Sequence, residues 1–202
     1  MREYTHIIFD LGNTIIRFDH NISARKIVNL FHLDTKKVYQ TFFDSHLTRD
    51  FETGIVSPRE FYARTTRYLG INIPYKDFID IWNDIFWADE DMCGLVRRLK
   101  GRYKLFLLSN VNRLHFDHIR EKFDIISVFD EVILSFVVGA MKPDRAIFDD
   151  VVRRAGGNRP GLLYIDDRED LIKEAVSMGI DSIKFQGYDK LLEELAKREV
   201  RA

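Results

Sequence analysis

Six polar residues in this sequence each lie at the end of a short apolar segment or just beyond one. An apolar segment bounded by turn residues is typical of a buried parallel strand. Ligands of such sheets bind at the carboxyl ends of the strands. We therefore expect six side chains to meet at one edge of a sheet: Asp10, Ser109, Asn110, Lys142, Asp166 and Asp167.

These side chains combine three carboxylates with a lysine, a hydroxyl and an amide. Carboxylates that cluster in a cleft must be offset by a cation, and oxygen ligands beside a phosphate substrate favour Mg²⁺. Lys142 supplies a further positive charge, and Ser109, with the amides beside it, offers hydrogen bonds to phosphate oxygens. The residue types therefore predict a magnesium site that handles a phosphate group.

Strands and helices are expected to alternate along most of the chain. Helical periodicity and capping residues predict helices between the apolar segments. The segments themselves predict strands over residues 7–9, 105–108, 132–134, 162–165 and 182–185. This alternation predicts the α/β class, with a doubly wound, Rossmann-like parallel sheet.

Residues 17–90 interrupt the alternation with four helical patterns and no strand signal. Asn21 is expected to cap the first of these helices, and the last is expected over residues 77–87. The sequence therefore predicts a four-helix cap inserted after the first strand. Residues 1–16 and 91–202 are expected to form the core domain.

Composition limits the classes of partner. The chain has 202 residues and a formal net charge of -1, so no basic surface suggests nucleic acid. No apolar segment approaches the ~18 residues of a membrane span, and the first strand begins too early to leave room for a signal peptide. A single cysteine, Cys93, suits a reducing cytoplasm. We expect a cytoplasmic monomer or homodimer that acts on a small molecule.

The order of these segments resembles that of the haloacid dehalogenase superfamily. Four motifs carry the resemblance: Phe9-Asp10-Leu11-Gly12-Asn13-Thr14, Leu108-Ser109-Asn110, Lys142-Pro143, and Ile165-Asp166-Asp167 with Asp170. Together they span the whole core, and the helical insert lies where the type-1 cap of the superfamily sits. The resemblance implies an enzyme that cleaves small phosphate monoesters.

The resemblance also implies a role for each residue. Asp10 would attack phosphorus and form an aspartyl-phosphate. Lys142 would counter the charge of this nucleophile and, with Ser109 and Asn110, bind the phosphoryl oxygens. Mg²⁺ would be held by Asp10, the carbonyl of Gly12, and a carboxylate of the fourth motif, either Asp166 or Asp167.

Gly12 departs from the pattern of most superfamily phosphatases. They carry a second Asp there, which protonates the leaving group and then activates water. General acid catalysis contributes about 10²–10⁴-fold, and glycine can offer only its carbonyl. An Asp-Leu-Gly-Asn branch that includes a bacterial glucose-1-phosphate phosphatase resembles this chain in having glycine there, and it also shares the Asn-Arg-Leu-His of residues 112–115. This favours sugar phosphates, with glucose 1-phosphate hydrolysed faster than glucose 6-phosphate.

Two alternatives to a phosphatase follow from the same residues. A 2-haloacid dehalogenase uses the same nucleophile without a metal, but the resemblance implies neutral residues in place of Asp166 and Asp167. A non-catalytic protein that binds a phosphate ligand or a partner is compatible with Gly12. Magnesium-dependent phosphate release would separate an enzyme from a binding module.

Other polar residues offer weaker hypotheses. His115 and His118 lie three apart on an expected helix, as metal ligands could, although capping or surface roles are the simpler interpretation. Four residues of the insert are expected to approach the site and could contact the leaving group of the substrate: Arg17, Asp19, Arg49 and Glu52.

Overall fold

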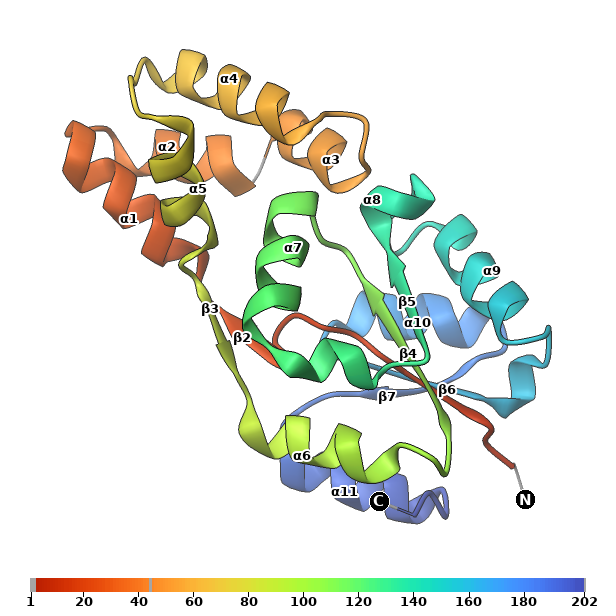
Figure 1. Cartoon of the computed structure of the whole chain (residues 1–202). Coiled ribbons are helices and arrows are strands. Elements are labelled where there is room, and N and C mark those ends of the chain that lie inside the picture. The colour runs from red at the N-terminus through yellow and green to blue at the C-terminus, as the bar shows by residue number, and fades with distance from the viewer. Residues whose placement is uncertain (1–2, 44, 202) are drawn as a thin grey trace.

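Five parallel strands form the main sheet of the structure, a computed structural model that describes residues 3–43 and 45–201 (Figure 1). Their order is β5-β4-β1-β6-β7, and each pairs with its neighbour in parallel. The strands are β1 (His6–Phe9), β4 (Lys104–Ser109), β5 (Glu131–Leu134), β6 (Leu162–Asp166) and β7 (Asp181–Lys184). All five match the strands expected from the sequence, and the doubly wound α/β class is confirmed.

Alternate residues of each strand face opposite layers of helices, as the two-residue period of a strand requires. Ile7 and Phe9 pack into one apolar cluster and Ile8 into the other. The first cluster is covered by α6 (Glu90–Leu99), α7 (Arg113–Lys122) and α11 (Tyr188–Lys197). The second is covered by α9 (Arg145–Arg154) and α10 (Glu169–Ser177). Burial on both faces explains why these strands have continuous apolar sequences.

Short elements complete the core. The helix α8 (Ser135–Val138) follows β5, and the 3₁₀ turns η1 (Asp124–Val128) and η2 (Arg159–Gly161) precede β5 and β6. No helix among residues 3–43 and 45–201 has the length and apolar character needed to cross a membrane.

The insert differs from the sequence expectation in two ways. Its described residues form five helices, not four: α1 (His20–Phe31), α2 (Thr35–Phe43), α3 (His46–Glu52), α4 (Pro58–Leu69) and α5 (Tyr75–Asn83). They also include a strand pair, because β2 (Ile16–Phe18) and β3 (Phe86–Ala88) run antiparallel. The expected helix over 77–87 was therefore wrong at its end. Strands of three residues are too short to show a two-residue period.

The first helix of the insert begins two residues earlier than expected. Asp19, not Asn21, is the N-cap, and its Oδ1 accepts the backbone N–H of Asn21 at 2.8 Å. Asp and Asn are almost equally favoured at this position, so propensity alone cannot separate them. The predicted cap at Ser57 is confirmed, since its side chain accepts the backbone N–H of Glu60 at 3.2 Å.

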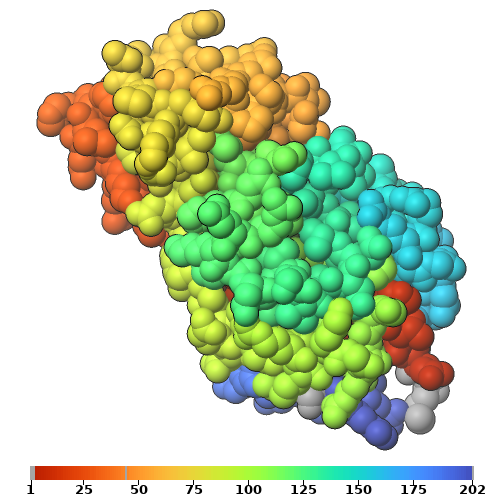
Figure 2. Space-filling model, viewed as in Figure 1, coloured from red at the N-terminus to blue at the C-terminus, as the bar shows by residue number. Residues whose placement is uncertain are grey.

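Aromatic side chains form the interior of the insert. Trp82 stacks near Phe61 and Phe78, with ring centroids 4.9 and 6.1 Å away, and is almost fully buried. In Figure 2 the orange and yellow residues of this insert form a lobe that rests on the green surface of the core. The helices α5 and α7 pack together at this junction. We propose that residues 17–90 act as a separate cap domain.

The strand order places the end of β1 at a topological switch. The chain passes from β1 outward through β4 to β5 and then returns to β6 on the other side of β1. In open α/β sheets a ligand crevice lies where the strand order reverses. Asp10 directly follows β1 and Asp166 ends β6, so both lie at this position.

Candidate active site

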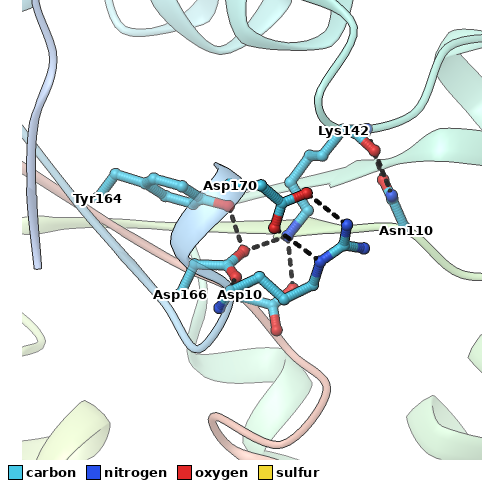
Figure 3. Close-up of polar contacts among 7 residues, drawn as sticks. Asp10, Asn110, Lys142, Tyr164, Asp166 and Asp170 are labelled. Atoms are coloured by element: carbon cyan, nitrogen blue, oxygen red, sulfur yellow. Dashed lines mark hydrogen bonds and ion pairs between the residues drawn. The ribbon is translucent and has the colours of Figure 1, made fainter. Parts of the chain in front are cut away.

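Lys142 joins two carboxylates at the switch point (Figure 3). Its Nζ donates to Asp10 Oδ1 at 2.6 Å and to Asp166 Oδ2 at 2.7 Å. All three side chains are buried, with exposed fractions of 7% for Asp10, 2% for Lys142 and 0% for Asp166. The site thus brings together residues that are separated by 132 and 24 positions in the chain.

Asp166 has partners on both carboxylate oxygens. Besides Lys142, its Oδ2 accepts the hydroxyl of Tyr164, and its Oδ1 accepts the backbone N–H of Arg168 at 2.9 Å. Asp167, by contrast, is partly exposed, and its side chain makes no hydrogen bond or ion pair with any other residue that the structure describes. The fourth-motif carboxylates therefore differ: Asp166 holds the lysine, and Asp167 is available to a ligand.

The site contains more negative than positive charge. Burial raises the pKa of Asp10, and Asp166 and Asp167 raise it further while Lys142 lowers it. Burial also raises the pKa of Asp167, with Asp166 adding to the effect. One lysine cannot balance three carboxylates, and Asp10, Asp166 and Asp167 each present a ligand atom within 4.8 Å of the others. This donor set fits a hard divalent cation.

Asn110 fixes the backbone of Lys142. Its Nδ2 donates to the carbonyl of Lys142 at 2.8 Å, and its Oδ1 accepts the N–H of Lys142 at 2.7 Å. Nδ2 carries a second hydrogen that this pairing does not use. Ser109 ends β4 and is buried at the edge of the same site. A phosphate-binding role for Ser109 and Asn110 stays a prediction.

Two adjoining cavities lie above these residues. The acidic cavity, of about 150 Å³, is lined by Asp10, Lys142, Asp166 and Asp167 among others. The cap cavity, of about 210 Å³, lies between insert and core and shares Gly12, Phe18, Asn110 and Arg168 with the acidic cavity. Its apolar lining consists of Leu11, Ile16, Phe18, Phe86, Val111, Ile119 and Met141.

Of the four insert residues expected near the site, Glu52 lines the cap cavity. The other three are placed elsewhere. Arg17 pairs with Asp89 at 2.8 Å, Asp19 caps α1, and Arg49 is exposed. Arg17 lies on the short strand β2 and Asp19 directly precedes α1, and because the sequence did not predict β2, spacing could not separate these four.

His115 is a structural link between core and cap, not a metal ligand. It is almost fully buried, and its two ring nitrogens lie 3.0 Å from Asn112 Nδ2 and 3.1 Å from the Trp82 carbonyl. This pairing requires a neutral ring in which Nε2 donates and Nδ1 accepts. Burial lowers the pKa of His115 to about 3. His118 makes no hydrogen bond to Asn112 or to the Trp82 carbonyl.

Sequence reasoning missed several residues of the site. Tyr164 was assigned to a buried strand, and its hydroxyl contact with Asp166 has no separate signal in the sequence. Phe18 and His20 enter the cap cavity because β2 directs the chain there. Arg168 lines both cavities, and its guanidinium pairs with Asp170 at 2.6 Å.

Comparison with known proteins identifies the family. A model of the haloacid dehalogenase-like hydrolases matches residues 4–179. The chain belongs to this family of hydrolases. The family resemblance of the four motifs is thereby confirmed, and the matched segment contains every site residue described above.

Three characterised relatives of this hydrolase share about a fifth of its sequence. A D-ribitol-5-phosphate phosphatase of Bacteroides thetaiotaomicron is 21% identical over 89% of this chain and 90% of its own. A sesquiterpene phosphatase of Aspergillus oryzae is 22% identical over 86% of this chain and 85% of its own. A drimenol cyclase of Aspergillus calidoustus is 22% identical over 94% of this chain, which spans only 35% of that protein.

Solved structures share the fold. A haloacid dehalogenase family enzyme of B. thetaiotaomicron, in complex with magnesium and inorganic phosphate, superposes with a TM-score of 0.84. It is 22% identical, and the match covers 93% of this chain and 98% of the other. A family member from Porphyromonas gingivalis superposes with a TM-score of 0.82 at 25% identity, covering 96% and 98% of the two chains.

Proposed function

We propose that this hydrolase is a Mg²⁺-dependent phosphatase that cleaves small phosphate monoesters through an aspartyl-phosphate on Asp10. The observation that carries the proposal is the buried lysine bridge between Asp10 and Asp166, with Asp167 beside it. The phosphatases among its relatives, and the magnesium and phosphate bound in a protein of the same fold, support it.

Asp10 is placed to act as the nucleophile. Its Oδ1 is held by Lys142, and its second oxygen has no partner within the described part of the chain. The strand β1 fixes the backbone behind it, since Asp10 N donates to the carbonyl of Ile165 at 2.9 Å. A nucleophile that is held rigidly in place lowers the cost of in-line attack on phosphorus.

Asp10, the carbonyl of Gly12 and Asp167 would hold the Mg²⁺. When bound, the cation would neutralise the phosphate and the carboxylates around it. We assign this role to Asp167 and not to Asp166, because both oxygens of Asp166 already accept hydrogen bonds. Lys142 keeps its bond to Asp166 and offers its charge to the phosphoryl oxygens, next to Ser109.

Two classes of leaving group are candidates for binding in the cap cavity. Sugar phosphates are favoured by the branch resemblance and by the ribitol phosphate relative. Phosphates of an apolar alcohol are favoured by the seven apolar side chains of the lining and by the sesquiterpene phosphatase relative. A cytoplasmic location and a monomeric or homodimeric state stay predictions.

Phosphate release tests the proposal. Glucose 1-phosphate, glucose 6-phosphate and 4-nitrophenyl phosphate should release phosphate in Mg²⁺ and not in excess chelator. Asp10→Asn should lose at least about 10³-fold in turnover, because an amide is a poor nucleophile. Asp149→Asn, an exposed carboxylate on α9, is the matched control and should keep full activity.

Two results would contradict the proposal. Full turnover in chelator would favour a metal-independent dehalogenase, which chloride release from 2-chloropropionate would then reveal. Absence of phosphate release from every ester, in protein that is folded and loaded with Mg²⁺, would favour a binding protein.

A further inference from the structure

The structure leaves no room for a general acid at position 12. A Cβ added to Gly12 would lie 2.8 Å from Cε1 of Phe18, closer than side-chain atoms approach one another. The Phe18 ring is itself held between His20 and Phe86, with centroids 4.7 and 6.1 Å away. A side chain that protonates the leaving alkoxide must therefore belong to another residue that lines the cavity.

Among the described residues, Glu52 supplies the carboxyl group that lines the cap cavity, together with Gly12 and Ser109 at the catalytic end. It is the last residue of α3, beside Phe51, whose ring stacks on Phe61 with centroids 4.4 Å apart. The Glu52 carboxyl makes no hydrogen bond or ion pair with residues 3–43 or 45–201. Burial raises its pKa to about 7, so a large fraction carries a proton at neutral pH.

The core holds the end of α3 in place. Gly54, two residues after Glu52, has a φ of +76° and packs on the backbone of α8, where a Cβ would lie 2.3 Å from the carbonyl oxygen of Phe136. A side chain at Gly54 would push α3 away from α8. The close approach therefore fixes Glu52 relative to the catalytic residues, although it belongs to the cap.

The other ionisable groups of the cap cavity are poor proton donors. Both ring nitrogens of His115 are occupied, and burial lowers the pKa of His20 to about 4. Arg168 pairs with Asp170 at 2.6 Å, and this bond raises the pKa of its guanidinium further. Glu52 remains as the group that can both give and take a proton near pH 7.

We propose that Glu52 is the general acid that replaces the missing carboxyl at position 12. This inference rests on the proposed phosphatase function. As Asp10 bonds to phosphorus, the bond from phosphorus to the ester oxygen breaks, and the proton of Glu52 passes to that oxygen. The products are the free alcohol, phosphorylated Asp10 and the Glu52 carboxylate. Water then attacks phosphorus, its proton returns to Glu52, and inorganic phosphate leaves Asp10.

The test compares two aromatic esters of similar shape whose leaving groups differ in basicity. 4-Nitrophenyl phosphate releases a stable anion and needs no acid, whereas benzyl phosphate releases a basic alkoxide. The measured quantity is kcat/KM, which includes the departure of the alcohol but not the later hydrolysis of phosphorylated Asp10. Glu52→Gln should lower it about 10²–10³-fold for benzyl phosphate and less than about threefold for 4-nitrophenyl phosphate.

Two further variants control the comparison. Asp50→Asn changes a carboxyl to an amide on the same helix but outside the cavity, and it should change neither value. Glu52→Asp keeps an acid and should recover part of the benzyl phosphate activity. Equal losses on both esters in Glu52→Gln, or no loss on either, would overturn the role of Glu52. A parent enzyme that releases phosphate neither from these esters nor from the glucose phosphates would instead refute the phosphatase function itself.

Discussion

At the scale of single residues, the two carboxylates of the fourth motif differ more than their sequence suggests. Asp166 is enclosed by donors from Lys142, Tyr164 and Arg168, whereas Asp167 is partly exposed beside it. A carboxylate without a donor next to another carboxylate is destabilising until a cation binds. We therefore expect Asp167 to bind the metal and Asp166 to position the lysine.

Unfolding in denaturant tests this division without any substrate. Saturating Mg²⁺ should raise the unfolding free energy of the parent by about 3 kcal/mol at 100 times the dissociation constant. Asp167→Asn should be as stable as the parent in chelator, or more stable, and should lose most of the gain from Mg²⁺. The Asp149→Asn control should behave as the parent. An undiminished gain in Asp167→Asn would show that Asp167 is not a ligand.

The sequence predicted which residues meet at the site but not what each contacts. A strand that ends at Asp10 or Asp166 fixes where the carboxylate lies, because the sheet geometry is regular. The direction of a hydrogen bond depends on side-chain torsions and on neighbours from distant segments. For this reason Asn110 was assigned to the phosphate, and its pairing with the Lys142 backbone was not foreseen.

At the scale of elements, the buried strands were predictable and the short strand pair was not. Four or more apolar residues between turns identify a segment such as β4. The pair β2 and β3 has three residues in each strand, and Phe86 continues the apolar pattern of α5. Because β2 carries Phe18 into the site, this missed element determines what position 12 can hold.

Substitution at Gly12 tests the packing of β2 against the catalytic loop. Gly12→Ala should lower the unfolding free energy by about 1–3 kcal/mol, because the added Cβ meets the ring of Phe18. Adding Phe18→Ala should make the Gly12 substitution nearly neutral relative to Phe18→Ala alone. The measurement is a double-mutant cycle in urea. Additive losses would show that Phe18 does not limit the space at position 12.

At the scale of the whole molecule, cap and core are joined by side-chain and backbone contacts as well as by the strand pair β2 and β3. His115 of α7 stacks on Trp82, with ring centroids 4.7 Å apart, and lies 3.1 Å from the Trp82 carbonyl. The Gly54 turn packs on α8 at a second position. These contacts hold the cap against the core at two places, so we expect cap and core to unfold together.

The His115 link predicts a dependence of stability on pH. Burial lowers its pKa to about 3 in the folded protein, whereas an unfolded histidine titrates near 6.5. Between these values the unfolded chain binds more protons, so stability is full above about pH 6.5 and falls as pH decreases. From pH 7 to pH 5 the contribution of His115 amounts to about 2 kcal/mol.

Comparison with His115→Gln isolates this contribution, since glutamine does not titrate. The variant should be less stable at pH 7 but should lose about 2 kcal/mol less than the parent between pH 7 and pH 5. His20 lies next to His115, with ring centroids 6.4 Å apart, and titrates in the same window, so both proteins should carry His20→Gln to remove its effect. Identical losses in parent and variant would mean that His115 is not buried in the neutral form.

The central claim is that Asp10 forms a covalent bond to phosphorus. Rapid acid quench during turnover of 4-nitrophenyl phosphate in Mg²⁺, followed by peptide mass spectrometry, measures this bond directly. We expect a phosphoryl adduct on the peptide that contains Asp10, and this adduct should be sensitive to hydroxylamine and absent from Asp10→Asn and from samples in chelator. An adduct on another residue, or full turnover by Asp10→Asn, would show that Asp10 is not the nucleophile.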